Sequence, residues 1–454
     1  MISKSYNQEW QVGVDVGGTN TDLLFLNRQT GEYKVAKLST TSDQSLAVIQ
    51  GIESGPSPVA ELAAVVHGTT IATNAVLERK GARCGLITTR GFRDILELGR
   101  RTRPNNYGMT GSFEPLIDRE LRLEVSERLD ARGRVLLPLD EDEVRTALKT
   151  LHELGAEAVV IHFLHAYANP VHEQRAADIA RNNWPTGFIS ISSDILREVR
   201  EFERGSTAAV NAYVQPVLSS YLSRISDRLQ EAGFGHDLLV MQGNGGTLTA
   251  SAAARQPVQT VMSGPAAGAV AAAHIGQQSG FDNLIACDMG GTSFDVSVIV
   301  GATPSLSAEK DLAYGIPVRV PMVDIHTIGA GGGSIARVDS AGLLRVGPES
   351  AGAQPGPVCY GRGGTKPTVT DANLVLGRID VSGFSGVVQA ENALSNAQAA
   401  IKKEVGNPLQ LDTVDAAAAI LAVSCNQLAS AIRLVSIEKG HDPRDFALFA
   451  FGGA

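Results

Sequence analysis

One short pattern occurs twice in this chain and constrains its fold more than any other feature. "VGVDVGGTNTD" begins at Val12, and "IACDMGGTSFD" begins at Ile285. In both copies an apolar stretch leads to an aspartate, two glycines, a threonine and a second aspartate, and every matching pair has the same separation in sequence. Two adjacent glycines after a strand permit a tight hairpin. The repeat therefore predicts one strand–turn–strand hairpin in each half of the chain.

The residues of this repeated turn suit a phosphate group and a metal ion. Without Cβ atoms, the backbone N–H groups of a turn can converge on an anion. The threonine adds a hydroxyl, and aspartates can hold Mg²⁺, usually through water. An ordinary acid-capped hairpin has similar residues, but the recurrence favours a ligand site. The chain has no GxxxxGK[ST] loop and no GxGxxG motif after a strand. The stretch "GAGGGS" from Gly329 differs from GxGxxG at Ser334. The hairpins are therefore the predicted phosphate site.

Size and composition predict a soluble globular protein with more than one domain. The 454 residues exceed the length at which one core keeps growing. A net charge of −9 argues against nucleic acid as a partner. Four scattered cysteines without a CxxC motif favour a reduced, cytoplasmic location. There is no apolar signal peptide core, and the alanine-rich runs near 266–273 and 415–425 look too short for a bilayer, so no membrane is expected.

Alternating strand and helix patterns predict an α/β fold with a mixed or parallel sheet covered by helices. The stretch 192–233 reads as helical, with interruptions near Gly205 and Pro216, and is the predicted junction between halves. Residues 340–370 are rich in glycine and proline and are predicted to be loop.

The last part of the chain predicts a long helix and then a strand. The helix is expected after the N-cap Asp412 and is expected to stop at Gly440. "FALFAFGGA" is expected to be a buried strand that ends in a Gly-Gly turn.

Several polar residues are candidates for the substrate side of the site. His67 ends a predicted buried strand and is either catalytic or a hydrogen-bonded structural residue. "GRRTRP" contains Arg100, Arg101 and Arg103, one of which could stabilise a transferring phosphoryl group or bind a carboxylate. A solvated basic turn explains these arginines equally well.

Four other residues have structural interpretations that we favour. His162 and His165, three apart on a predicted strand, would lie on opposite faces and could not share a metal ion. Asp371 is expected to cap a helix. Cys359 lies in the Gly/Pro-rich stretch with no base nearby, so we do not expect a reactive thiol.

The paired motifs and the final "FGGA" resemble the phosphate-1, phosphate-2 and adenosine segments of the actin/hexokinase/heat-shock ATPase superfamily. More narrowly, the chain resembles the hydantoinase A / 5-oxoprolinase family, which includes ATP-dependent N-methylhydantoinase and acetone carboxylase subunits. The stretches that carry this likeness include "HGTTIATNAVLERKGAR", "REFERGSTAAVNAYVQP", "MSGPAAGAV" and "SAGAQPGPVCYGRGG". Family members continue well beyond the "FGGA" segment, so the resemblance implies a C-terminally truncated chain.

The resemblance also implies a fold and a nucleotide site. The fold would be two duplicated actin/hexokinase-like (ribonuclease H-like) lobes around a nucleotide cleft, with an N-terminal hydantoinase/oxoprolinase domain at 1–204 and a hydantoinase A domain at 205–454. Asp15 and Asp288 would hold Mg²⁺. The catalytic residues implied by the resemblance are Asp288, Asp295 and Asp22, and His67 and Arg100 join them as candidates from the sequence itself. The implied nucleotide contacts are Gly17, Gly18, Thr19, Asn20, Gly290, Gly291, Thr292, Ser293, Gly331, Gly332, Gly452 and Gly453.

The activity implied by the resemblance is ATP-dependent hydrolysis of a cyclic amide through phosphorylation of the amide oxygen. Hydantoin, 5-oxoproline and related lactams are the candidate substrates. A larger hydantoinase B-like subunit would complete a hetero-oligomer. Two alternatives stay open: an ATP-dependent ketone carboxylase subunit, and a non-enzymatic nucleotide switch. A sugar kinase is less favoured.

Overall fold

The computed structural model describes residues 9–16, 20–39, 43–102, 107, 108, 111, 113–380 and 392–453. The chain divides into two units. Unit 1 comprises Met1–Ala267 with Leu306–Met322, and unit 2 comprises Gly268–Ser305 with Val323–Ala454. The junction predicted near 204/205 falls inside helix α7 (Glu201–Glu231), which lies wholly within unit 1. A division into two lobes at that point stays a prediction.

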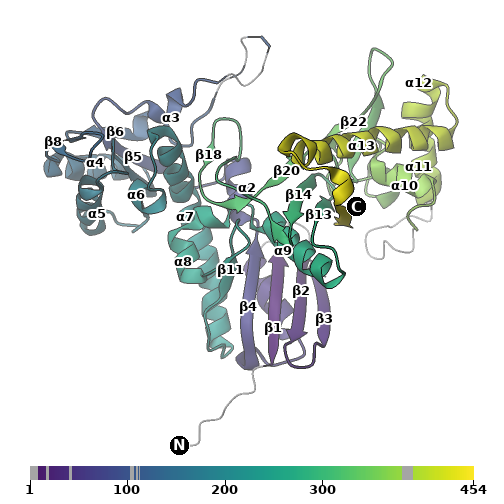
Figure 1. Ribbon diagram of the computed structural model, residues 1–454, viewed down its shortest axis with the longest axis horizontal. Helices are drawn as coiled ribbons and strands as arrows, with labels where there is room; N and C mark the ends of the chain where they lie inside the picture. The colour runs from purple at the N-terminus through teal and green to yellow at the C-terminus, as the bar shows by residue number, and fades with distance from the viewer. Residues whose placement is uncertain are drawn as a thin grey trace, which may run out of the picture. The chain divides into compact units, whose positions relative to one another are not determined.

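The main sheet of unit 1 is mixed and has the strand order β12-β11-β4-β1-β2-β3 (Figure 1). Antiparallel pairing joins β1 to β2 and β2 to β3, whereas β4 runs parallel to β1. Alternate residues of β1, such as Val12 and Val14, enter the core, as the two-residue period of a strand requires. The strands are β1 (Trp10–Val16), β2 (Asn20–Asn27), β3 (Tyr33–Ser39), β4 (Leu62–Thr69), β11 (Leu239–Met241) and β12 (Thr247–Thr249).

A second, four-stranded sheet in unit 1 is entirely parallel, in the order β10-β9-β5-β6. Strands β5 and β9 are buried along their whole length, as parallel strands covered on both faces should be. The strands are β5 (Cys84–Thr89), β6 (Arg122–Val125), β9 (Ala158–His162) and β10 (Ile189–Ile191).

Helices and short ribbons complete unit 1. The helices include α1 (Gln44–Glu53), α2 (Ile71–Leu77), α3 (Ile95–Leu98), α4 (Glu141–Glu153), α5 (Val171–Asn183), α6 (Ser192–Ile195) and α8 (Ala250–Arg255). The two-stranded ribbons include β7 (Arg128–Leu129) with β8 (Val135–Leu137), and β17 (Lys310–Asp311) with β18 (Pro317–Val318).

Helix α7 corrects one prediction, because it continues without interruption through Gly205 and Pro216. A Cβ atom on Gly205 would lie 3.1 Å from the imidazole of His162, so this glycine permits close packing and does not break the helix. The first half of α7 is buried on nearly all sides. Packing of that buried surface stabilises the helix and outweighs the local cost of the proline.

Unit 2 contains a sheet in the order β15-β14-β13-β23, and β20 also pairs with β14. Figure 1 labels β13, β14 and β20 of this sheet. Strands β13 and β14 are antiparallel, whereas β23 runs parallel to β13. Residues of α9 pack with Leu284 and Ala286, and residues of α13 pack with Ile285 and Cys287, so the two helices cover opposite faces. The elements are β13 (Leu284–Met289), β14 (Phe294–Val300), β15 (Thr303–Pro304), β20 (Ile325–Ile328), β23 (Ala447–Phe451), α13 (Thr413–Val435) and, from Gly268 onward, α9 (Ser263–Gln278).

The predicted loop at 340–370 is only partly irregular. Residues 344–350 form a strand that pairs with the preceding one, because an isolated ribbon tolerates glycine and proline better than a central strand does. Asp371 completes a capping box with Thr368, and Cys359 is buried. The elements here are β21 (Ser334–Val338), β22 (Leu344–Ser350), α10 (Val369–Val375), α11 (Ala393–Ile401) and α12 (Asn407–Leu409).

The long C-terminal helix begins after the N-cap Asp412, as predicted, and a short 3₁₀ turn then leads to Gly440. By length and composition Thr413–Lys439 could cross a membrane, which corrects the expectation drawn from the shorter alanine-rich run. This is weak evidence for a membrane span, since core helices of globular domains share these properties, and Ala431 and Val435 of α13 pack in the core of unit 2.

Strand β23 was predicted to be buried, and this is wrong. Its residues alternate between half-buried and exposed, and Leu448 keeps 63% of its surface exposed.

Candidate functional site

In both repeated motifs the flanking strands pair antiparallel, as predicted for a hairpin, and the two pairs have the same register. Asp15 lies directly opposite Asp22 in one, and Asp288 lies directly opposite Asp295 in the other. Directly opposed residues of an antiparallel pair project from the same face. Each repeat therefore sets two carboxylates side by side where the strands enter the turn.

The turn of the second hairpin presents unused hydrogen-bond donors. Its closing bond runs from the Gly290 N–H to the Ser293 carbonyl, at 2.9 Å. Gly291 and Thr292 at the tip are exposed. Within the described parts of the chain, no protein acceptor takes the backbone N–H groups of these two residues. Amides that are exposed in this way can donate to an anion. The phosphate contacts expected of Gly291 and Thr292 stay predictions.

A glycine-rich loop supports this turn from behind. The N–H of Gly332 donates to the Gly290 carbonyl at 3.0 Å, and the N–H of Gly333 donates to the Gly291 carbonyl at 2.7 Å. A Cβ atom on Gly331 would lie 2.6 Å from the Gly290 oxygen, so only glycine allows this approach. These loop glycines are buried and position the turn. The nucleotide contacts expected of Gly331 and Gly332 stay predictions.

Two further residues approach the carboxylates of the second hairpin. Gly452, at the end of β23, has a φ of +103°, and a Cβ atom there would collide with Oδ1 of Asp288 and with the Met289 backbone. Gly453 follows in an exposed position. From β20, the Thr327 hydroxyl donates to Oδ1 of Asp295.

The tip of the first hairpin, Gly17 to Thr19, and the side chain of Asn20 lie outside the described residues. The strands that lead into this turn are within the described residues. The ammonium group of Lys37, on β3, lies 2.9 Å from Oδ1 of Asp22. Desolvation and the neighbouring charge of Asp22 raise the pKa of the Asp15 carboxyl.

His67, on β4, is fully buried and has both ring nitrogens in contact with protein groups. Nε2 lies 2.9 Å from the Tyr221 hydroxyl, and Nδ1 lies 3.3 Å from the Val14 carbonyl. Because a carbonyl only accepts, we assign the proton to Nδ1, and the tyrosine then donates to Nε2. Burial lowers the pKa of His67 to about 4. This geometry fits the hydrogen-bonded structural interpretation better than catalysis.

The other candidates lie elsewhere in unit 1. Arg100 donates through Nε to Glu203 at 2.9 Å and also binds Glu309, so its charge is already compensated. Arg103 lies outside the described residues. His162 ends β9, with Nδ1 3.0 Å from the Ser192 hydroxyl, and His165 lies beyond that strand.

Sequence reasoning missed three residues that contact the candidate side chains. Lys37 contacts Asp22, Tyr221 contacts His67 and Thr327 contacts Asp295. Each of the three lies on a different strand or helix from its partner, so no local sequence motif predicts the contact.

Comparison with known proteins identifies the family. Residues 11–184 match the hydantoinase/oxoprolinase N-terminal region, and residues 204–454 match hydantoinase/oxoprolinase. The chain belongs to the hydantoinase/oxoprolinase family. Among its relatives, the caprolactamase subunit alpha of Pseudomonas jessenii is 38% identical over 98% of this chain and 66% of the relative. The acetophenone carboxylase gamma subunit of Aromatoleum aromaticum is 37% identical over 98% and 63%.

Solved structures of this family share the mixed α/β fold. The ATP-dependent caprolactamase from Pseudomonas jessenii matches with a TM-score of 0.85 at 36% identity, over 98% of this chain and 66% of the other. Nucleotide-free acetone carboxylase matches with a TM-score of 0.80 at 31% identity, over 98% and 65%. This family member therefore spans about two thirds of the length of these relatives.

Proposed function

We propose that this chain is the ATP-using part of an enzyme that opens a cyclic amide by phosphorylating the amide oxygen. The observation that carries the proposal is the second hairpin, where the free amides of Gly291 and Thr292 lie next to the opposed carboxylates of Asp288 and Asp295. This arrangement occurs in a family whose members include the caprolactamase subunit alpha, at 38% identity.

The residues of the second hairpin fit a magnesium-bound nucleotide. The exposed amides would donate hydrogen bonds to the oxygens of a terminal phosphate. Magnesium keeps several waters and usually takes one or two carboxylates, and the described residues contain no cluster of three or more metal-ligating side chains. Asp288 would hold the ion, with Asp295 beside it. The bound ion would neutralise phosphate charge during transfer.

We extend the proposal to the fold and to the first hairpin. In an actin/hexokinase-like arrangement, with a first lobe ending near residue 204, Gly17, Gly18, Thr19 and Asn20 would contact the same nucleotide. Asp15 would assist with the metal ion, and Asp22 is the alternative to Asp295 as general base. The equal registers of the two hairpins support this duplication.

Phosphorylation solves the chemical difficulty of the substrate, because an unstrained amide is a poor electrophile. The bond between the γ-phosphorus and the β–γ bridging oxygen breaks, and a bond from the amide oxygen to phosphorus forms. Water then adds to the activated carbon and loses its protons to a base, the carbon–nitrogen bond breaks, and the amine takes up a proton, which leaves an acyl phosphate. A second water attacks the carbonyl carbon of this acyl phosphate and gives its protons to a base, and phosphate leaves with the original amide oxygen. The protein supplies positioning and charge stabilisation.

A lactam labelled with ¹⁸O in its carbonyl tests this route. The protein, alone and with a larger hydantoinase B-like subunit, is incubated with the labelled lactam and ATP in ordinary water. We expect ¹⁸O in the released phosphate, read by mass spectrometry. Label that stays in the ring-opened acid would contradict this route, in which phosphate departs with the original amide oxygen. A rate of ATP turnover that does not change when the lactam is added would favour a nucleotide switch.

Carboxylation of a ketone is the second candidate, because the acetophenone carboxylase gamma subunit is 37% identical. Its first step would also be phosphorylation, on the oxygen of a ketone enolate. Incubation with a ketone, ATP and ¹⁴C-bicarbonate separates the two candidates, since only the carboxylase fixes label into an acid. Several relatives are named as subunits, and we propose a hetero-oligomer in the cytoplasm.

A further inference from the structure

The buried glycine loop 331–333 of unit 2 pairs all of its backbone N–H and C=O groups. The N–H of Gly331 donates to the Ser334 hydroxyl, and the N–H groups of the other two glycines donate to the turn of the second hairpin. The three carbonyl oxygens accept from N–H groups outside the turn, which are Ser334 to Gly331 at 3.0 Å, Thr370 to Gly332 at 2.8 Å and Ala351 to Gly333 at 2.8 Å. A buried loop with every polar group paired is held in one conformation.

The geometry of the peptide unit connects the two sides of this loop. In a trans peptide the C=O of one residue and the N–H of the next point in opposite directions. The Gly291 carbonyl accepts from Gly333, so the N–H of Thr292, which belongs to the same peptide, points away from the loop. The N–H of Gly333 shares its own peptide with the Gly332 carbonyl. The direction of the Thr292 amide therefore depends on what holds the Gly332 carbonyl.

Two groups of Thr370 hold the Gly332 carbonyl. The Thr370 N–H donates to it at 2.8 Å, and the Thr370 hydroxyl donates to it at 2.9 Å. Thr370 lies in the first turn of α10, where N–H groups have no partner within the helix, so this N–H can bind another segment. Thr370 is only 6% exposed, and hydrogen bonds in such buried surroundings are stronger than bonds in water.

Asp371 fixes the start of α10, and with it the position of Thr370. The fully buried Asp371 carboxylate accepts from the N–H and the hydroxyl of Thr368, both at 2.8 Å. It also accepts from the N–H groups of Val358, at 3.1 Å, and Cys359, at 2.8 Å. The first turn of α10 is thus tied to a second segment of unit 2.

A separate path orients the amide of Gly291. The Gly290 carbonyl, in the same peptide, accepts from the N–H of Gly332. That N–H shares its peptide with the Gly331 carbonyl, which accepts from the N–H of Ser334. The two exposed amides of the turn are therefore oriented by different donors.

We propose that Thr370 is a positioning residue that orients the Thr292 amide toward the terminal phosphate of ATP. The proposal rests on the proposed function, which places that phosphate at the amides of the second hairpin. Thr370 acts through the 332–333 and 291–292 peptides and not through contact with the nucleotide.

Two variants separate the hydroxyl of Thr370 from the rest of its side chain, because Thr370→Val removes it and Thr370→Ser keeps it. Isothermal titration calorimetry measures binding of a non-hydrolysable ATP analogue with Mg²⁺, and of ADP with Mg²⁺. We expect Thr370→Val to weaken binding of the analogue about three- to tenfold, as loss of one hydrogen bond does, and to change ADP binding less than about twofold. Thr370→Ser should stay within about twofold of the wild type.

Three results of this titration would overturn the role of Thr370. The first is a Thr370→Val variant that binds the analogue as tightly as the wild type. The second is equal weakening for the analogue and ADP, which would indicate a merely structural role. The third is a loss in Thr370→Ser as large as the loss in Thr370→Val.

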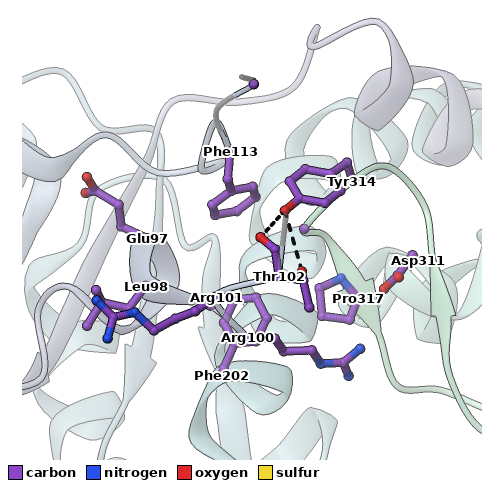
Figure 2. A pocket seen from close by; sticks show the side chains of 13 residues that line it. Glu97, Leu98, Arg100, Arg101, Thr102, Phe113, Phe202, Asp311, Tyr314 and Pro317 are labelled. Carbon is purple, nitrogen blue, oxygen red and sulfur yellow. Dashed lines mark hydrogen bonds between the residues drawn. The ribbon is translucent and has the colours of Figure 1, made fainter. Parts of the chain in front are cut away.

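Two control variants remove a hydroxyl that donates to a backbone carbonyl in unit 1. Thr260→Val is matched in chemistry and burial, because the buried Thr260 hydroxyl donates to the Pro257 carbonyl at 2.8 Å. Tyr314→Phe removes the bond from the Tyr314 hydroxyl to the Thr102 carbonyl (Figure 2). Both controls should bind the analogue as the wild type does. A loss in either control as large as that in Thr370→Val would overturn the specific role.

Amide NMR of the nucleotide-free protein tests the path itself. With ¹⁵N-labelled glycine and threonine, Thr370→Val should shift the amide resonances of Gly333 and Thr292, and shift that of Gly291 less, because Gly291 belongs to the separate path. A Thr292 resonance that does not move would overturn the path.

The failure of this proposal and the failure of the proposed function give different results. If the wild type binds the analogue and Thr370→Val binds it equally tightly, only the role of Thr370 fails. If the wild type binds neither nucleotide, the proposed function fails, and the role of Thr370 fails with it.

Discussion

The two hairpins have the same register, yet different groups surround their carboxylates. In the first, Asp22 pairs with the ammonium group of Lys37, and Gly68 of β4 lies against Asp15. In the second, Asp295 accepts a hydrogen bond from the Thr327 hydroxyl, and Gly452 of β23 lies against Asp288.

This difference separates the roles that the duplicated motif can take. A lysine adds positive charge and compensates one carboxylate, whereas a hydroxyl stabilises a carboxylate without adding charge. The lysine therefore weakens the attraction of the first pair of carboxylates for a divalent cation. We therefore expect the metal ion to depend mainly on Asp288, and to depend less on Asp15.

The largest expected effect comes from Asp288→Asn, compared with Asp15→Asn. Losing the Asp288 charge should lower lactam-dependent ATP turnover by about 10²-fold or more, as removal of a transition-state contact does. Asp15→Asn should lower lactam-dependent ATP turnover by a clearly smaller factor. A coupled assay of ADP release compares the two variants, and circular dichroism checks that both are folded. Equal losses in both variants would remove the distinction between the hairpins.

The strands next to the hairpins should differ in their response to pH. His67 on β4 has a folded pKa of about 4, below the 6.5 of a free histidine. The unfolded chain therefore binds the proton more readily between these values, and the free energy of unfolding falls as pH drops from 6.5 to 4, by up to about 3 kcal/mol.

NMR of the His67 ring tests this directly, because its carbon shifts report protonation. We expect a neutral ring at pH 5.5, and His67→Gln should lose this part of the pH dependence in urea unfolding. A ring that titrates near 6.5 in the folded protein would contradict the buried assignment. The corresponding strand β23 has Ala450 opposite Cys287 and no histidine, so it should add no such dependence.

The loop behind the second hairpin should tolerate no side chain, unlike the tip of the turn. Gly331→Ala places a methyl group against the Gly290 backbone and should cost about 1–3 kcal/mol of stability. Gly291→Ala is the matched control, because a Cβ there meets nothing within 4 Å, and it should change stability by less than about 0.5 kcal/mol. Thermal unfolding measures both. Equal melting temperatures would argue against support of the turn by this loop.

The smallest expected effect is that of Lys37→Met. The ion pair with Asp22 is substantially exposed, with 60% and 47% of the two side chains accessible. Such pairs contribute less than about 1 kcal/mol, and salt weakens them further. ATP turnover should change by less than tenfold. A loss as large as that of Asp288→Asn would mean that Lys37 acts on the nucleotide itself.

The sequence predicts a feature well when the contacts that determine it are made by residues close together in the chain. The hairpins follow from residues within one turn, and the α13 cap from Asp412 alone. The continuity of α7 through Gly205 and Pro216 depends on packing against other elements, so the local breaker signals were misleading. The neutral state of His67 comes from its burial. Its hydrogen-bond partner Tyr221 is 154 residues away, and no pattern around His67 reveals this contact.

A crystal grown with Mn²⁺ and a non-hydrolysable ATP analogue tests the central claim most directly. The account predicts an anomalous manganese peak at the Asp288 carboxylate, directly or through water, with the terminal phosphate about 3 Å from the amides of Gly291 and Thr292. Manganese and phosphates bound on a surface away from the second hairpin would contradict it.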